Sequence, residues 1–157
     1  MRPKRELQAG LLTAVEGFRH RIRRFLDFSQ RAARAAGLAP QQHQMLLVLA
    51  GGPAGPAPHI RLLAERLFLR HNSTVELVNR LERRGLAARV SRGGDRRRVA
   101  VRITPRGRRL LDRLTRHHLA ELRTAGPELV RALQRVIAGS RSAAPLRSRA
   151  RARRRPS

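Results

Sequence analysis

The sequence predicts a mainly α-helical chain that carries one small two-stranded sheet. The first reason is that apolar residues recur at intervals of three or four over most of the 157 residues, as they do along one face of a helix. The second is that residues 86–91 and 99–104 instead alternate in side-chain character, which is the pattern of a strand. The third is Gly93-Gly94 between these segments, a pair that favours a tight hairpin turn.

The first helix is predicted over residues 7–36. Its apolar stripe consists of Leu11, Val15, Phe18, Ile22 and Phe25. A stripe this narrow is typical of a coiled-coil seam, so we expect it to pack on its own domain, on a second chain, or on both. Gly37 is predicted to end this helix, and residues 1–5 are expected to form a short disordered basic arm.

A second helix is predicted to begin at Pro40, because proline suits the first helical position. Its apolar side consists of Met45, Leu46, Val48 and Leu49. The run of glycine and proline at 51–58 then interrupts regular structure. No Gly-Lys-Ser/Thr sequence follows these glycines, so we interpret the run as a connector and not as a phosphate-binding loop.

Two short helices are predicted next, over residues 60–69 and from about Ser73 to Gly85, where glycine is a natural helix stop. Ser73 and Glu76 have the spacing of a capping box, which would begin the second of these helices near Ser73, although residues 70–72 could equally supply the cap. The outward face of this helix is predicted to carry His71, Asn72, Thr74, Glu76, Asn79, Arg80 and Arg83.

The hairpin that follows carries four arginines and one aspartate between residues 92 and 98. A protruding cationic loop suits the minor groove of DNA, whose negative potential attracts arginine. Polar side chains at the start of a second helix suit hydrogen bonding to base edges in the major groove. Each element alone could be a solvated surface. The succession of a helix, a turn, a second helix and a cationic hairpin instead favours a unit that binds a nucleic-acid duplex.

After the hairpin, Thr104 is predicted to cap a helix that has Pro105 at its first position. This helix is expected to reach about Thr124, to be interrupted at Pro127, and to resume as a last short helix. Residues 139–157 are rich in arginine, contain no acidic residue and are expected to be disordered. This tail either adds sequence-independent phosphate contacts or has no selected role.

The chain has 36 Lys and Arg against 10 Asp and Glu, a formal net charge of +26, which indicates a polyanionic partner. Lys4 is the only lysine, so a GC-rich coding bias would account for part of the arginine content without any function. Aromatic residues make up 3% and all are phenylalanine. This favours a duplex over a single strand, because single-strand binders stack bases on aromatic side chains.

No cysteine occurs, which excludes disulfides, cysteine-metal sites and thiol-based oxidant sensing within this chain. The six histidines lack metal-ligand spacing, and no Ser-His-acid arrangement or carboxylate pair suggests catalysis. We therefore expect no enzyme activity, no metal and no cofactor. No apolar run reaches membrane-spanning length and no signal peptide pattern begins the chain, so we expect a cytoplasmic location and no membrane partner.

Three motifs resemble the winged helix-turn-helix of the MarR family of bacterial transcription regulators. They are Leu63-Ala64-Glu65-Arg66-Leu67, Val78-Asn79-Arg80-Leu81-Glu82 with Gly85-Leu86, and Asp95-Arg96-Arg97 followed by Val101, Ile103, Thr104-Pro105 and Gly107. The third is the most specific, because its spacing matches the wing signature of the family position for position. Around these motifs the resemblance extends loosely from about Leu7 to Ala138.

The resemblance implies a single winged helix-turn-helix domain over residues 1–138. Helices at 7–36 and 105–138 would form a homodimer, and residues 37–104 would form the DNA-binding lobe. Two such lobes related by a two-fold axis would meet successive major grooves about 34 Å apart.

The resemblance also implies roles for individual residues. Arg97 would enter the minor groove, with Asp95 orienting it and the recognition-helix residue Arg80. The first turn of that helix, residues 71–75, would read the major groove. Two positions depart from the family pattern: Arg70 stands where many members have serine, and Asn79 where many have aspartate.

We therefore predict a sequence-specific, double-stranded DNA-binding transcription regulator, in particular a homodimeric repressor that recognises a pseudo-palindromic operator. A small-molecule effector would bind in a crevice formed by the first helix, the Pro40 helix and the helix-turn-helix. The alternative is a non-specific architectural protein that coats nucleic acid through charge. The predicted DNA-contacting residues are Arg70, His71, Asn72, Ser73, Thr74, Glu76, Asn79, Arg80, Arg92, Asp95, Arg96 and Arg97.

Overall fold

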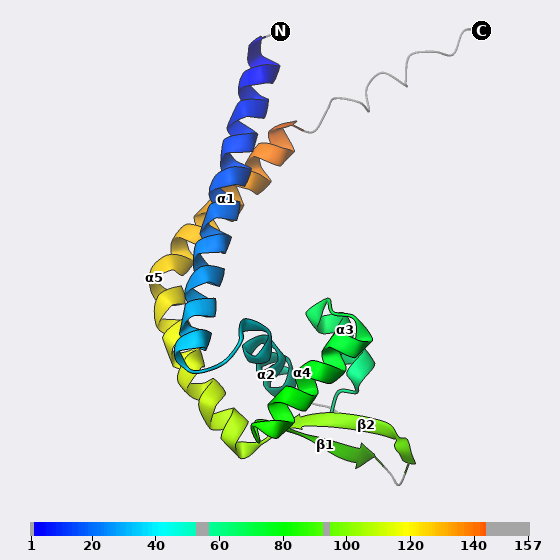
Figure 1. Ribbon diagram of the computed structural model, residues 1–157. Coiled ribbons are helices and arrows are strands. Elements are labelled where there is room, and N and C mark those ends of the chain that lie inside the picture. Colours follow the sequence, from blue (N-terminus) through cyan, green and yellow to red (C-terminus); the bar gives the residue numbers. More distant parts are fainter. Residues whose placement is uncertain (1, 53–56, 93–94, 144–157) are drawn as a thin grey trace, which may run out of the picture. The chain divides into compact units, whose positions relative to one another are not determined.

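The computed structural model is mainly α-helical, with one antiparallel sheet of two strands (Figure 1). It describes residues 2–52, 57–92 and 95–143, and the side chains of residues 8–52, 57–90 and 99–141. Within this part no helix is long and apolar enough to cross a membrane. The elements are α1 (Arg2–Ala35), α2 (Pro40–Gly51), α3 (Ile60–Leu67), α4 (His71–Arg83), β1 (Ala87–Arg92), β2 (Asp95–Ile103) and α5 (Pro105–Ala143).

The chain divides into two compact units. The first joins the part of α1 up to Phe25 to the part of α5 from Leu122 onward. Here Arg21 Nε lies 3.6 Å from Glu128 Oε2, and Ala132 is buried. The second unit runs from Leu26 to Glu121 and contains the remaining helices and the sheet.

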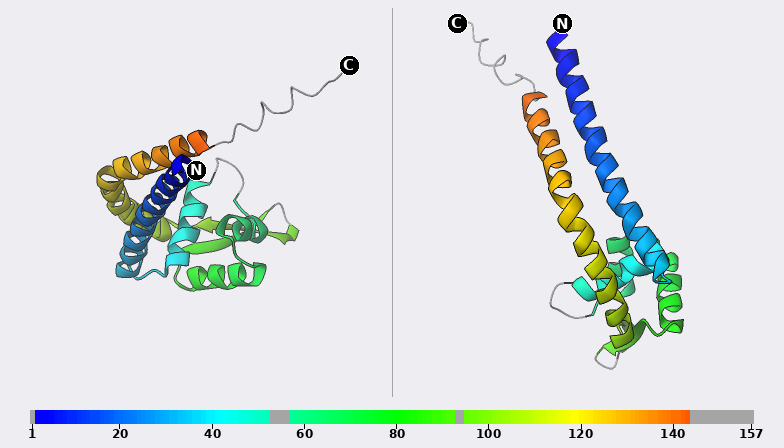
Figure 2. Two further views of the ribbon diagram at one scale, coloured as in Figure 1. Left: turned by 90° about the horizontal axis from the view of Figure 1, so that it is seen from above. Right: turned by 90° about the vertical axis from the view of Figure 1, so that its left-hand side faces the viewer.

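The core of the second unit is a cluster of aliphatic side chains from all of its elements. Its fully buried members include Met45 and Leu46 of α2, Leu63 of α3, and Val78 and Leu81 of α4. The two strands extend from this core as a ribbon that reaches beyond the helices of the unit (Figure 2). The helices therefore form a rigid base from which the hairpin projects.

The ends of three helices follow the local signals in the sequence. Gly37 and Gly85 have φ angles of +74° and +64°, a conformation that glycine adopts without steric cost. After each glycine, the next backbone N–H donates to a carbonyl of the last helical turn, from Leu38 to Ala33 and from Leu86 to Leu81, both at 2.9 Å. The predicted start of α2 at Pro40 is confirmed as well.

The predicted boundaries of α1 and α5 are wrong at three places. α1 begins at Arg2, so the expected disordered arm is helical from that residue. α5 is continuous through Pro127 and ends at Ala143. Proline removes one hydrogen bond and does not end a helix when packing holds both sides, and the buried Ala132 supplies such packing beyond Pro127. Residues 139–143 of the predicted tail are therefore helical, and the rest of the tail lies outside the described residues.

The sheet register corrects the face predicted for β1. Ala87 lies opposite Ile103 and Arg89 opposite Val101, and directly opposed residues share a face. Ala87 and Val101 are both buried in the core, whereas the alternation in the sequence predicts Leu86, Ala88 and Val90 as the apolar face of this strand. Leu86 is buried too, but it precedes the strand.

Candidate nucleic-acid interface

α3 has a different kind of cap at each end, and the second one forms the turn into α4. At the start of α3, His59 Nδ1 accepts a hydrogen bond from the Leu62 N–H at 3.1 Å. At its end, Phe68 has a φ of +54° and its N–H is directed at the carbonyls of Ala64 and Glu65. The Phe68 side chain is 96% exposed. Sequence reasoning missed this residue, because no glycine marks the left-handed position.

The first turn of α4 presents polar side chains to solvent. α4 begins at His71 with Arg70 as its N-cap. The cap is therefore one of residues 70–72, the second of the two possibilities that the sequence left open, and the start predicted near Ser73 is wrong. Arg70, His71, Asn72 and Ser73 are all exposed. The Arg70 side chain forms no capping hydrogen bond, and uncapped amides at a helix N-terminus suit phosphate oxygens.

Thr74 was predicted on the outward face, and the structure contradicts this. Its side chain has no exposed area, and its hydroxyl donates to the Arg70 carbonyl at 3.0 Å. Thr74 precedes Leu77, Val78 and Leu81 by three, four and seven residues, so helical periodicity places it on the same inward face. Thr74 therefore stabilises the first turn and is removed from the set of candidate DNA contacts.

A chain of polar contacts joins α4 to β1. The Arg89 guanidinium forms an ion pair with Glu82, and the Arg89 backbone N–H donates to Glu82 Oε1 at 2.7 Å. Arg89 Nη2 also donates to Asn79 Oδ1 at 2.9 Å. Asn79 Nδ2 in turn donates to Glu76 Oε1 at 3.3 Å. α4 is thereby fixed to the base of the hairpin, and Arg89 takes a structural role that the sequence did not indicate.

The remaining predicted DNA contacts on α4 differ in exposure and in the hydrogen bonds that hold their side chains. Arg80 and Glu76 are exposed, whereas Asn79 is half-buried and held by Arg89. Asn79 thus accepts a hydrogen bond from Arg89 without carrying a charge. Arg80 has an open path to a partner at the surface of α4.

The hairpin pairs regularly up to Ser91 and Val99, and then shifts so that Arg92 lies opposite Asp95. The single step from Ser91 to Arg92 on β1 thus faces four steps on β2, from Val99 to Asp95. The backbone of Arg96 and Arg97 therefore lies in the irregular end of the ribbon. The side chains of Arg92, Asp95, Arg96 and Arg97 lie outside the described residues, as do all pairings predicted for them.

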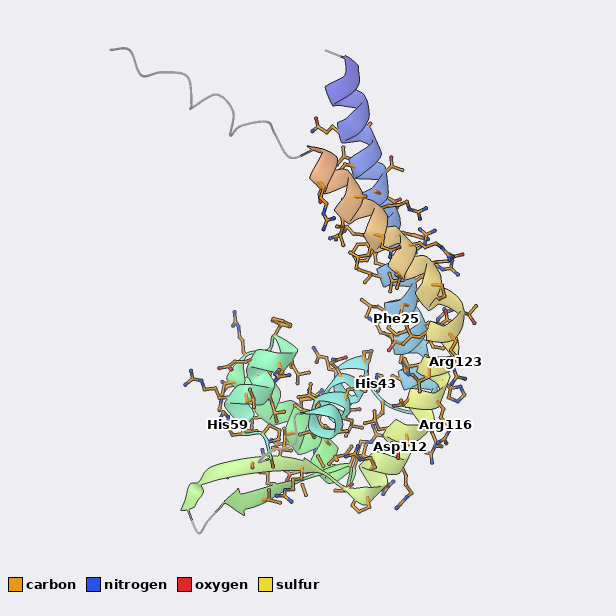
Figure 3. The ribbon with its side chains drawn as sticks, turned by 180° about the vertical axis from the view of Figure 1, so that it is seen from behind. Phe25, His43, His59, Asp112, Arg116 and Arg123 are labelled. Carbon is orange, nitrogen blue, oxygen red and sulfur yellow. The ribbon has the colours of Figure 1, made fainter. Side chains whose placement is uncertain are left out.

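A buried pair of imidazoles lies away from this surface. The rings of His43 on α2, which is labelled in Figure 3, and His118 on α5 stack at 4.9 Å. His118 Nδ1 lies 2.6 Å from the Leu114 carbonyl, and its Nε2 lies 2.8 Å from Ser29 Oγ. Burial, and secondarily the neighbouring His118, lower the pKa of His43. Across the described residues no cluster of three His, Asp or Glu could hold a metal ion.

The crevice predicted for an effector has only a partial counterpart. A small cavity of about 210 Å³ is lined by α1 and α2, including Leu26, Ser29, Gln41 and His43, but by no residue of the helix-turn-helix.

Residues 36–98 match a family model described as MarR family. A putative transcriptional regulatory protein for the hcr operon of Thauera aromatica is 32% identical over 112 residues, which are 69% of this chain and 66% of that protein. The chain thus spans about two thirds of the length of this curated relative.

Two solved structures are similar as well. CouR from Rhodococcus jostii RHA1, bound to p-coumaroyl-CoA, is 31% identical with a TM-score of 0.57, over 77% of this chain and 85% of that one. A point mutant of MepR from S. aureus, bound to an oligodeoxyribonucleotide, has a TM-score of 0.61 at 18% identity, over 80% of this chain and 93% of that one. The second shows likeness of fold alone.

Proposed function

The chain belongs to the MarR family of transcription regulators, and from this premise we propose that it is a sequence-specific repressor. It would bind double-stranded DNA as a homodimer on a pseudo-palindromic operator. The observation that carries this proposal is the Arg89 bridge, in which one strand residue holds both Glu82 and Asn79 of α4. A bridge of this kind keeps a helix and a hairpin at a fixed separation. A protein that contacts two adjacent grooves of DNA needs such a fixed separation.

The first turn of α4 would enter the major groove. The exposed His71, Asn72 and Ser73 side chains offer donors and acceptors for base edges, and the exposed Arg70 and Arg80 add charge for phosphates. Arg97 at the wing would enter the adjacent minor groove, with Arg92 and Arg96 on the flanking backbone and Asp95 orienting Arg97.

Homodimerisation would use α1 and α5, over the segments 7–36 and 105–138. In the first unit these helices leave large apolar side chains exposed, namely Leu12, Val130, Leu133 and Ile137. Exposed apolar residues on two adjoining helices favour a protein partner, and a second copy of the chain would place two recognition helices on one face of a duplex.

A small organic anion is the proposed effector. CouR binds an aromatic acyl thioester in its solved structure, and the present chain, with its net charge of +26, would attract anions of this size. Binding of the effector would favour a conformation with lower affinity for DNA.

Selection from random duplexes tests the proposal against the alternative of a non-specific architectural protein. A repressor of this kind enriches one pseudo-palindromic site and binds it roughly 10³-fold more tightly than random duplex. Sedimentation of the complex should give two chains per site. Enrichment of no site, together with a steep salt dependence on every duplex, would establish the architectural alternative.

A further inference from the structure

Phe68, the C-cap of α3, has an unusual backbone conformation for an aromatic residue. Its φ of +54° is the only positive φ of a non-glycine residue in the described part of the chain. This left-handed conformation costs free energy in any residue that has a Cβ, and glycine would avoid that cost. Because the Phe68 ring is 96% exposed, packing within the chain does not offset it.

The residues on either side of Phe68 hold its backbone in place. Leu67 and Leu69 are both half-buried and pack against the core of the second unit. The Leu69 N–H donates to the Ala64 carbonyl at 3.0 Å. The Phe68 N–H donates to the Glu65 carbonyl at 3.3 Å. The fold therefore needs the left-handed turn at this position and does not need the phenyl ring.

The ring adjoins the candidate nucleic-acid interface along the chain. Arg70, two residues further on, is the N-cap of α4, and His71 and Asn72 follow in the first turn of that helix. All three side chains are exposed, as is Arg66 before the turn. A phenyl ring among exposed cationic and polar side chains suits a partner that offers anionic and apolar groups together.

We propose that Phe68 is an operator contact, whose ring packs against an apolar group of double-stranded DNA beside the first turn of α4. The duplex offers two such groups, the deoxyribose of the backbone and the 5-methyl group of thymine in the major groove, and phenylalanine suits the methyl group. Burial of the ring in the complex supplies the apolar stabilisation that this position lacks in the free chain. This inference rests on the proposed function, because it adds an apolar contact to the polar and cationic ones of the same surface.

Such a contact has a distinctive signature in free and bound protein. Glycine at position 68 removes the backbone strain of the free chain and also removes the ring from the complex. Stability and duplex affinity should therefore change in opposite directions, as they do where a strained residue serves binding. A residue that serves folding alone would change both in the same direction.

Fluorescence anisotropy with the site that the parent enriches from random duplexes tests the inference. Phe68→Gly and Phe68→Asn, which both tolerate a left-handed φ, should each lose about 5- to 20-fold in affinity, the order expected for exposing part of a phenyl ring. Their urea midpoints should be at or above that of the parent. Phe68→Leu keeps an apolar side chain and should restore part of the affinity. The matched control Leu47→Ala removes an exposed apolar side chain of α2 in the same unit and should bind as the parent does.

Replacing each thymine of the site by deoxyuridine, one at a time, removes only the methyl group. A position that weakens binding of the parent and not of Phe68→Gly identifies the thymine methyl as the contact. A loss in Phe68→Gly without such a position assigns the contact to deoxyribose.

Fluorine NMR observes the contact directly. The chain has four phenylalanines and no tyrosine or tryptophan, so labelling with 4-fluorophenylalanine gives one signal for each phenylalanine. The Phe68 signal, identified by its absence in Phe68→Leu, should lose its H2O/D2O solvent shift when the duplex is added.

A Phe68 signal that stays solvent-exposed in the saturated complex would overturn the inference. So would parental affinity in Phe68→Gly, an equal loss in Leu47→Ala, or a change in the number of chains per particle in Phe68→Gly, which would make the ring a protein–protein contact. Failure of the parent to enrich any site would instead contradict the proposed function, and the ring contact would still be measurable on a random duplex.

Discussion

Arg89 on β1 and Glu82 on α4 form a half-buried ion pair that joins the wing to the recognition helix, with the backbone N–H of Arg89 bound to the same carboxylate. Their side chains are 32% and 27% exposed. Arg89 also donates to Asn79, one of the predicted DNA contacts, so the pair acts by holding the two DNA-binding elements together.

Replacing Arg89 with methionine should therefore reduce stability and duplex binding together. The change leaves the Glu82 carboxylate and the Asn79 carbonyl without their guanidinium donor, which should lower the free energy of unfolding by about 1–2 kcal/mol in urea denaturation. The control Arg61→Met breaks the exposed pair with Glu65 on α3 and should cost less than about 0.5 kcal/mol. Equal losses in both variants would contradict the role assigned to Arg89.

Arg97→Ala tests the wing itself. Loss of an arginine from the minor groove should weaken operator binding by roughly 10- to 100-fold, while the unfolding transition and the dimer remain unchanged. Arg102→Ala is the matched control, because Arg102 is exposed on the regular part of the same strand. Fluorescence anisotropy with the selected operator measures both. An Arg97→Ala protein with parental affinity would remove the wing from the interface.

The local signals in the sequence were sufficient to predict a helix end wherever one residue determines the backbone conformation. Gly37 and Gly85 adopt positive φ angles, Pro40 begins α2, and Thr104 Oγ1 accepts the Gly107 N–H at 3.0 Å at the start of α5. Each of these positions has a chemical reason that acts within four residues. These helix ends were enough to predict the order of the elements along the chain.

Features that depend on packing were beyond local reasoning. The burial of Thr74 is not one of these features, because its spacing of three, four and seven residues from Leu77, Val78 and Leu81 already indicates the inward face. The pairing of β1 with β2 shifts between Ser91 and Arg92, so that Arg92 lies opposite Asp95, and no alternation of side chains reveals this shift. α5 passes through Pro127 because residues beyond it pack on α1. Of the candidate site, the exposed first turn of α4 was predictable and the Arg89 bridge was not.

Phe68→Gly should stabilise the protein. A left-handed φ costs a residue with a Cβ about 1–2 kcal/mol, and the greater freedom of glycine in the unfolded chain returns about 0.4–1 kcal/mol of this. Because the Phe68 ring is 96% exposed, removing it sacrifices little packing, and a net gain of about 0.5–1 kcal/mol is expected. Phe68→Ala keeps the Cβ and should leave the urea midpoint nearly unchanged. A gain as large for alanine as for glycine would show that the backbone is not the source.

The lowered pKa of His43 gives the stability a defined dependence on pH. Below the unfolded pKa of about 6.5 and above the lowered folded pKa, the unfolded chain binds more protons than the native one. Stability therefore falls as the pH drops through this window. His43→Phe keeps a ring against His118 and removes the titration, and the buried Nε2 that it deletes has no hydrogen-bond partner.

Urea denaturation from pH 7.5 to 5 should accordingly show a flatter loss of stability for His43→Phe than for the parent. The control His20→Gln removes an exposed histidine of α1 and should keep the parental slope. Parallel curves for His43→Phe and the parent would mean that other groups carry the acid sensitivity.

Removing residues 144–157 should weaken binding to operator and random duplex by the same factor. The segment contains six arginines, Arg147, Arg149, Arg151, Arg153, Arg154 and Arg155. Each arginine that neutralises a phosphate adds about 0.9 to the slope of log affinity against log salt concentration. The truncated chain should therefore show a slope shallower by up to about 5 in anisotropy titrations over a KCl series. Replacing the six arginines with serine keeps the length and should have the same effect. A loss confined to the operator would instead make this segment part of sequence recognition, since charge alone does not distinguish one duplex from another.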